Sequence, residues 1–238
     1  MPFLVVLDTS VILAACLDPK MDAKADLAAQ VLKTLEQAGV RPAITEGIRA
    51  EVETKLYDRV GQMVDGLRAL ASSPPPLPFE SGQTALEFLE PLFAKLRRDM
   101  EGSSGALQLL ESRLAAILED SPITTSNQWM NLARNVAVEA TAMLVEIQRR
   151  QDALGLDALA KAGTVDHEMF RQFVPKSDLE HIAVLAATSE ARSVKILFVT
   201  MDANLHGVRD EIAKAAPNLI VTMPVYLRRQ LSRLAGGK

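Results

Sequence analysis

Two apolar runs, far apart in the sequence, each end on a carboxylate. Residues 3–7 lead directly into Asp8, and residues 195–199 lead through Thr200 and Met201 into Asp202. Continuous apolar runs of this length are typical of strands buried on both faces of a parallel sheet. Ligands of open α/β sheets bind just beyond the carboxyl ends of such strands. The pattern therefore predicts an α/β fold in which Asp8 and Asp202 meet in a pocket suited to a hard cation.

The composition is that of an ordinary globular protein. The chain has 238 residues, of which 48% are hydrophobic and 24% are charged, and its formal net charge is −4. This length suits one large domain or one domain with a long insertion. The slightly acidic balance means that any affinity for nucleic acid would depend on local basic patches.

The cysteine content, the first residues and the apolar runs all bear on where the protein is located. Cys16 is the single cysteine, so an internal disulfide is excluded, and its apolar surroundings indicate a buried thiol rather than a nucleophile. The first residues lack a basic segment and their apolar run is interrupted at Asp8, which argues against a signal peptide. The sequence contains no uninterrupted run of about 18 apolar residues, which is the length needed to span a membrane. We expect a soluble, cytoplasmic protein.

The two ends of the chain have α/β patterning, whereas the middle has only helical patterning. Helices are predicted over 11–17 and 23–38, the latter ended by Gly39, and a strand over 40–44 is followed by Thr45 as a helix N-cap. After the middle, we expect a capping box at Ser177 and Glu180, a helix over 203–215, a strand over 219–221 and a helix over 225–234.

The middle, residues 58–165, is predicted to be almost entirely helical. Its longest helix is expected over 126–151, where eight apolar residues form one stripe that is interpreted as core or interface: Trp129, Leu132, Ala133, Val136, Ala140, Met143, Leu144 and Ile147. The predicted organisation is therefore an α/β domain formed by residues 1–57 and 166–238, with a helical insertion at 58–165 packed on or beside it.

Four carboxylates occupy positions that this fold could bring together. Asp8 and Asp202 end strands, Glu51 lies in the helix after Thr45, and Asp178 opens a later helix. Each also has an ordinary explanation. Asp8 and Asp178 could cap helices, Asp202 could form an Asx turn, and Glu51 could pair with Lys55 at i+4. The three histidines, His167, His181 and His206, are interpreted as packed or surface residues.

The order and spacing of these motifs resemble the PIN-domain family of metal-dependent ribonucleases, which includes toxins of the VapC kind. The resemblance covers roughly residues 1–57 and 175–227 and depends on Asp8-Thr9-Ser10, Glu51, Asp178 and Thr200-Met201-Asp202. It implies a PIN-like three-layer fold around a central parallel sheet. It departs from a compact PIN domain in the long segment between Glu51 and Asp178, whose helices could pack beside the sheet, cover the site or form a homodimer interface.

The resemblance also implies a role for each residue. Asp8, Asp178 and Asp202 would be catalytic metal ligands, and Glu51 would bind the metal or position the water. Ser10 or Thr9 would orient Asp8, and Thr200 would support the site. The cofactor would be Mg²⁺ or Mn²⁺, the substrate single-stranded RNA and the candidate protein partner an antitoxin. A second copy of the chain is a further candidate partner, because the helices of the insertion could form its interface.

Two other functions fit part of the pattern. A phosphatase of the haloacid dehalogenase type also has a strand that ends on Asp, but it normally carries a second Asp where Ser10 stands. A non-catalytic RNA- or protein-binding module could use the same fold. The four acids argue against it, because without cations they would repel one another strongly.

Overall fold

The structure is a computed structural model that describes residues 2–16, 23–55, 87, 90, 91, 94, 116 and 125–236. The chain divides into two compact units. One unit contains Met1–Glu53 and Arg150–Lys238, and the other contains Thr54–Arg149. All four candidate acids belong to the first unit.

The first unit is built on one sheet of five parallel strands, so the predicted α/β class with a central parallel sheet is confirmed. The strands are β1 (Phe3–Leu7), β2 (Pro42–Thr45), β3 (Asp157–Leu159), β4 (Lys195–Val199) and β5 (Leu219–Thr222). Their order across the sheet is β3-β2-β1-β4-β5. The chain therefore leaves β1 to one side for β2 and later returns to the other side for β4, which makes the β1–β4 boundary the topological switch point.

The two central strands are the apolar runs of the sequence. Val5 of β1 pairs with Leu197 of β4, and Leu7 pairs with Val199. These side chains are fully buried, as strands covered on both faces require. Because the strands are parallel and in this register, the residues that follow Leu7 and Val199 emerge side by side at one edge of the sheet.

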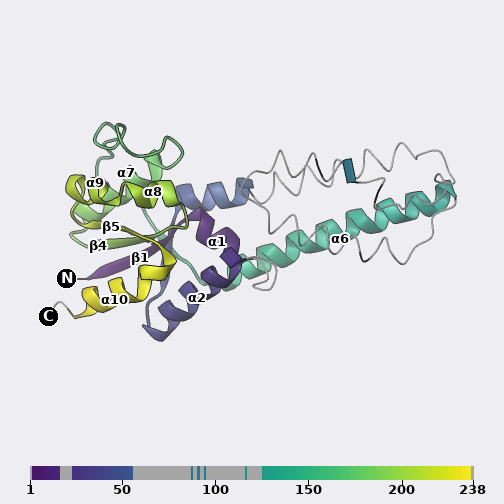
Figure 1. The fold of residues 1–238 in the computed structure, drawn as a ribbon, viewed down its shortest axis with the longest axis horizontal. Coiled ribbons are helices and arrows are strands. Elements are labelled where there is room, and N and C mark those ends of the chain that lie inside the picture. Colours follow the sequence, from purple (N-terminus) through teal and green to yellow (C-terminus); the bar gives the residue numbers. More distant parts are fainter. Residues whose placement is uncertain are drawn as a thin grey trace. The chain divides into compact units, whose positions relative to one another are not determined.

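Helices cover both faces of the sheet (Figure 1). On one side lie α2 and α10, and on the other lie α7, α8 and α9. The described helices of this unit are α1 (Thr9–Ala15), α2 (Ala23–Gln37), residues 46–55, α7 (Leu179–Ala191), α8 (Ala203–Gly207), α9 (Arg209–Ala215), the short 3₁₀ helix η1 (Pro224–Tyr226) and α10 (Leu227–Ala235).

Several sequence predictions about these elements hold. Strand 195–199 is found as predicted, and β5 extends the predicted strand by one residue. Gly39 follows α2 with a φ of 64°, a conformation that glycine adopts without strain. The Thr45 hydroxyl accepts a hydrogen bond from the Ile48 amide at 3.3 Å, as an N-cap does.

Other predictions are wrong in detail. The helix expected over 203–215 is interrupted at Val208, which separates α8 from α9. The capping box does not form, because Glu180 pairs with His167 and the Ser177 hydroxyl donates to Asp178. The helical segment predicted over 58–165 contains a strand, β3, which pairs with β2 and lies in the first unit.

The second unit contributes one long described helix. The helix predicted over 126–151 is found as α6 (Ser126–Ala153), whose last residues belong to the first unit. Trp129, Leu132 and Val136 are buried, so this part of the apolar stripe is core as predicted. The side chains of Ala140, Met143, Leu144 and Ile147, and most of residues 58–124, lie outside the described residues.

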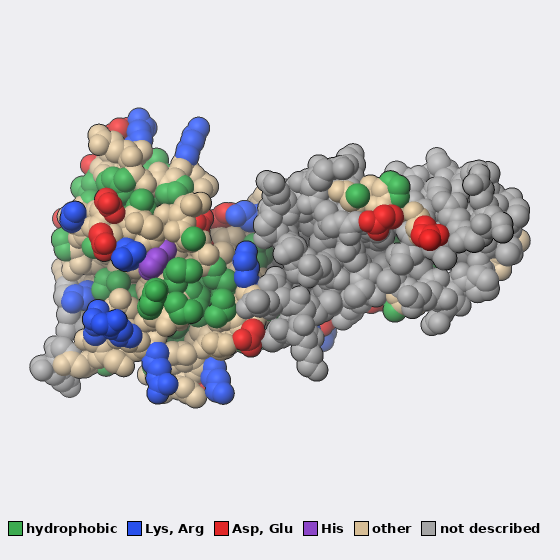
Figure 2. All heavy atoms as spheres, viewed as in Figure 1, with side chains coloured by type: hydrophobic (Ala, Val, Ile, Leu, Met, Phe, Trp, Pro, Cys, Tyr) green, Lys and Arg blue, Asp and Glu red, His purple; other side chains and the backbone are tan. Residues whose placement is uncertain are grey.

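The charged surface and the buried cysteine are those expected from the sequence. On the face drawn in Figure 2, several Lys and Arg side chains and a few Asp and Glu side chains lie around a hydrophobic patch. None of the helices in the described part of the chain is long and apolar enough to cross a membrane. Cys16 is buried, and burial raises the pKa of its thiol to about 12, so it stays protonated at neutral pH.

Candidate functional site

Asp8 lies at the centre of the site and is nearly inaccessible, with 6% of its surface exposed. It follows β1 and is the N-cap of α1. Its Oδ2 atom accepts hydrogen bonds from the Ser10 hydroxyl at 2.5 Å, from the Thr200 hydroxyl at 2.9 Å and from the Ser10 amide at 3.3 Å. Among the described residues nothing donates a hydrogen bond to Oδ1, so one oxygen is fixed and the other can accept a ligand.

The two hydroxyls that hold Asp8 also join the ends of β1 and β4. The Thr200 hydroxyl accepts from the Asp202 amide at 3.0 Å, and the Ser10 hydroxyl accepts from the Met201 amide at 3.1 Å. Thr200 is fully buried. Each hydroxyl thus donates to Asp8 and accepts from the β4 loop, which fixes the direction of the carboxylate.

Asp202 serves the fold with one oxygen. It is the N-cap of α8, and its Oδ1 atom accepts from the Asn204 amide at 2.7 Å and the Leu205 amide at 3.2 Å. The Asx turn suggested by the sequence is therefore present, and the same oxygen also caps α8. No described residue donates to Oδ2, so capping and ligand binding are compatible at Asp202.

Glu51 reaches the site from the helix formed by residues 46–55. Its Oε2 atom accepts from the Thr9 hydroxyl at 2.6 Å and lies 2.8 Å from Nε2 of His181. The resemblance left open whether Ser10 or Thr9 orients Asp8. In the structure Ser10 does so, and Thr9 orients Glu51 instead.

Asp178 stands at the start of α7. It occupies the N-cap position but makes no side-chain cap hydrogen bond, and its Oδ2 atom accepts from Ser177 at 2.8 Å. Burial raises the pKa of Asp178, and the negative charges of Asp8 and Asp202 raise it further. The charges of Asp8 and Asp202 therefore act on Asp178, which is the effect expected of neighbouring acids.

His181 is the site residue that the sequence interpretation missed. Its side chain is only 11% exposed and it faces Glu51. The hydrogen bond with Glu51 raises the pKa of His181 despite the opposing effect of burial, and the charges of Asp8 and Asp178 act in the same direction as Glu51. The available signal was its spacing from Asp178: three residues along a helix place two side chains on the same face.

The donor set suits a hard divalent cation. Carboxylate oxygens are the usual protein ligands of Mg²⁺ and Mn²⁺. In the ranges that the structure describes, no three His, Cys, Asp or Glu side chains are already arranged to hold an ion. The chemistry of the site thus fits a metal, while its ligand geometry is not preformed.

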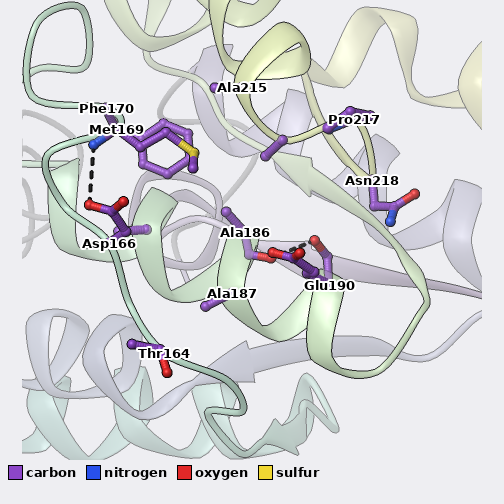
Figure 3. Close-up of a pocket in the computed structure, with 13 residues that line it drawn as sticks. Thr164, Asp166, Met169, Phe170, Ala186, Ala187, Glu190, Ala215, Pro217 and Asn218 are labelled. Atoms are coloured by element: carbon purple, nitrogen blue, oxygen red, sulfur yellow. Dashed lines mark hydrogen bonds between the residues drawn. The ribbon is translucent and has the colours of Figure 1, made fainter.

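A second concave feature lies at the other end of α7 (Figure 3). This cavity of about 280 Å³ is bordered by Ala186, Ala187 and Glu190 of α7 and by Ala215, Pro217 and Asn218 ahead of β5. It lies at the amino ends of β4 and β5, away from the acids. Its lining combines apolar side chains, many of them alanine, with polar ones that include Asp166 and Glu190.

Comparison with known proteins finds no matching family model, no matching curated protein and no matching solved structure.

Proposed function

We propose that the protein is a metal-dependent endoribonuclease that cuts single-stranded RNA, with Mg²⁺ or Mn²⁺ as cofactor. The observation that supports this proposal is the hydrogen-bond network at the β1–β4 switch point, in which the Thr200 hydroxyl donates to Asp8 and accepts from the Asp202 amide. Neighbouring carboxylates in a partly buried site destabilise the apo fold unless a cation or protons offset their charge. The PIN-like resemblance supports the choice of phosphodiester hydrolysis.

Each residue of the site would have a separate role in binding the metal or orienting its ligands. Asp8 and Asp202 each present an oxygen to which no described residue donates a hydrogen bond, and Asp178 adds a third carboxylate. Bound Mg²⁺ or Mn²⁺ would supply an activated water and stabilise the leaving oxygen. Because the ligands are not preformed, the carboxylates adjust when the ion binds. The hydroxyls of Ser10 and Thr200 would keep Asp8 oriented, because hydrogen bonds to a metal-binding carboxylate fix its direction.

Glu51 is a positioning residue or a further ligand. Its Oε2 atom is held by Thr9 and His181, so its carboxylate is fixed relative to Asp8 and can orient a water molecule. The resemblance also supports proposing an antitoxin partner, and the long segment between Glu51 and Asp178 supports proposing a homodimer.

The test is cleavage of a labelled single-stranded RNA by the purified full chain. We expect cleavage with Mg²⁺ or Mn²⁺ and none with a chelator. Asp8→Asn and Asp178→Asn should each lower the rate by at least about a hundredfold, the loss typical when metal-site groups are altered. Glu190→Gln is the matched control, because it neutralises a carboxylate on the same helix as Asp178 at the opposite end, and it should cut like the wild type.

Three results would contradict the proposal. One is full activity in Asp8→Asn with an unchanged circular dichroism spectrum. A second is RNA binding without any cleavage under all metal conditions, which would favour a non-catalytic module. The third is hydrolysis of p-nitrophenyl phosphate but not of RNA, which would favour a phosphatase.

A further inference from the structure

Two aromatic rings stack on each other beside the acids. The rings of His206 and Tyr226 have centroids 5.7 Å apart and planes 19° apart. His206 lies in α8, which follows β4, and Tyr226 ends η1, which follows β5. The pair therefore joins segments that leave two neighbouring strands at the same edge of the sheet.

This pair is tied directly to the proposed catalytic site. The His206 amide donates to the Asp202 carbonyl at 3.0 Å, and the Thr200 amide donates to the Thr222 carbonyl at the end of β5, also at 3.0 Å. His206 is one helical turn from Asp202, which is about 6 Å along the helix axis. A nucleotide adjoining a phosphodiester held at the acids could place its base at the rings.

The stacked pair of His206 and Tyr226 lies at the surface rather than in the core. Tyr226 is 48% exposed and the neighbouring Val225 is 64% exposed. Large apolar groups on a soluble protein commonly mark a binding surface when they adjoin one another. Burial, followed by the charge of Arg209, lowers the pKa of His206.

Basic side chains continue from the pair. Arg228 and Arg229 are exposed in the first turn of α10, immediately after Tyr226. Neither forms an ion pair with another residue in the described part of the chain, whereas Arg209 lies 3.6 Å from Asp210. On the face drawn in Figure 2, Lys and Arg side chains lie beside a histidine and a hydrophobic patch.

Building on the ribonuclease proposed above, we propose that His206 and Tyr226 form a stacking platform for one base of single-stranded RNA. Aromatic rings stack with any base, and arginines alongside contact the phosphates, which is the usual combination in proteins that bind single strands. Arg228 and Arg229 supply the phosphate contacts. The platform determines which nucleotide of the strand lies next to the acids.

The test measures binding without cleavage. A short oligouridine carrying one 2-aminopurine is titrated with the full chain in a chelating buffer, and both anisotropy and 2-aminopurine fluorescence are recorded. Tyr226→Leu removes the ring but keeps a bulky apolar side chain, and should weaken binding about 5- to 150-fold, the range of one base–aromatic stack. It should also abolish the quenching of 2-aminopurine.

Matched variants separate stacking from other effects. Tyr226→Phe keeps the ring and should bind and quench like the wild type. Val225→Ala trims the adjacent exposed side chain and should also change nothing. His206→Gln removes the other ring and provides a second test if Tyr226→Leu proves unstable in thermal melts.

The platform is wrong if Tyr226→Leu and His206→Gln, both folded, bind and quench like the wild type. It is equally wrong if Tyr226→Phe loses as much affinity as Tyr226→Leu, or if the wild type does not bind the oligonucleotide. The ribonuclease proposal fails separately. Binding and quenching without metal-dependent cleavage would refute the nuclease and retain the platform, whereas cleavage with unchanged Tyr226→Leu binding would do the reverse.

Discussion

The two ends of α7 lie near opposite ends of the strands of the same sheet, and they differ in the side chains that surround them. The amino end carries Asp178 and His181 and faces the acids at the carboxyl ends of β1 and β4. The carboxyl half (the alanine end) carries Ala186, Ala187 and Glu190 and borders a cavity at the amino ends of β4 and β5 (Figure 3). The helix of 13 residues separates them by about 20 Å.

The two ends of α7 are held in place by different interactions. At the acidic end, repulsion among carboxylates opposes folding, and hydroxyl groups and His181 hold the carboxylates in place. At the alanine end, hydrogen bonds to residues 160–162 hold the helix. The Ala162 amide donates to the Thr188 hydroxyl at 3.2 Å, and Arg192 donates to the Ala160 carbonyl at 2.9 Å. Substitutions that change charge should therefore affect stability at the acidic end of α7, and substitutions that change side-chain volume should affect it at the alanine end.

The largest effect on stability is expected at the alanine end. Gly163 has a φ of 79°, and a Cβ atom there would lie 2.8 Å from the Ala187 carbonyl oxygen and 3.1 Å from the Ala191 Cβ. Gly163→Ala should cost about 2 kcal/mol or more in the free energy of unfolding, because backbone strain and a clash with backbone add together. Urea unfolding measures this loss, and metal-dependent cleavage per folded molecule should not change.

Gly155→Ala is the matched control. Its φ is 59°, but a Cβ atom there would meet nothing within 4 Å. We expect only the strain cost, about 1 kcal/mol. If the two substitutions cost the same, the contact between Gly163 and α7 contributes nothing, and close packing does not distinguish the alanine end.

A smaller and pH-dependent effect is expected at the acidic end. The bond to Glu51 raises the pKa of His181 above its ordinary value of 6.5. The stabilisation from this pair is therefore fully present below pH 6.5 and is lost as the pH rises through the higher folded-state pKa. His181→Gln should lower the free energy of unfolding by about 1 kcal/mol below pH 6 and by less above pH 8. Urea unfolding over pH 5–9 gives the two curves.

His167→Gln serves as the comparison for that experiment. His167 pairs with Glu180 at an exposed position, where ion pairs contribute little. Its unfolding curve should follow that of the wild type across the range. A loss in His181→Gln that is constant with pH would show that the ring acts by packing alone.

The sequence predicted the parts of the site that follow buried strands. Asp8 and Asp202 could be located because β1 and β4 are continuous apolar runs, and parallel pairing then brings their ends together. The switch point between β1 and β4 follows from the same pairing. Strand β3 was missed because it has three residues, of which Asp157 and Ala158 are exposed, so no apolar run marks it.

The contacts made by side chains could not be predicted in the same way. His181 meets Glu51 across 130 positions of sequence, and no local pattern specifies such a partner. The capping box failed for the same reason, since Glu180 has a partner in His167, a residue outside its own helix. Local spacing identified which residues share a helix face, but only the folded sheet determined what that face meets.

The melting temperature of the full chain, measured with and without Mn²⁺, shows whether these carboxylates form one metal site. At a hundredfold excess over the dissociation constant, binding to the folded state alone should add about 2.7 kcal/mol, or roughly 5–10 °C at this size. Asp202→Asn, which can still cap α8, should raise the metal-free melting temperature and blunt the response to Mn²⁺, whereas Asp202→Ala should lose about 1 kcal/mol of capping. A wild-type melting temperature unaffected by millimolar Mn²⁺ and Mg²⁺ would contradict the metal site.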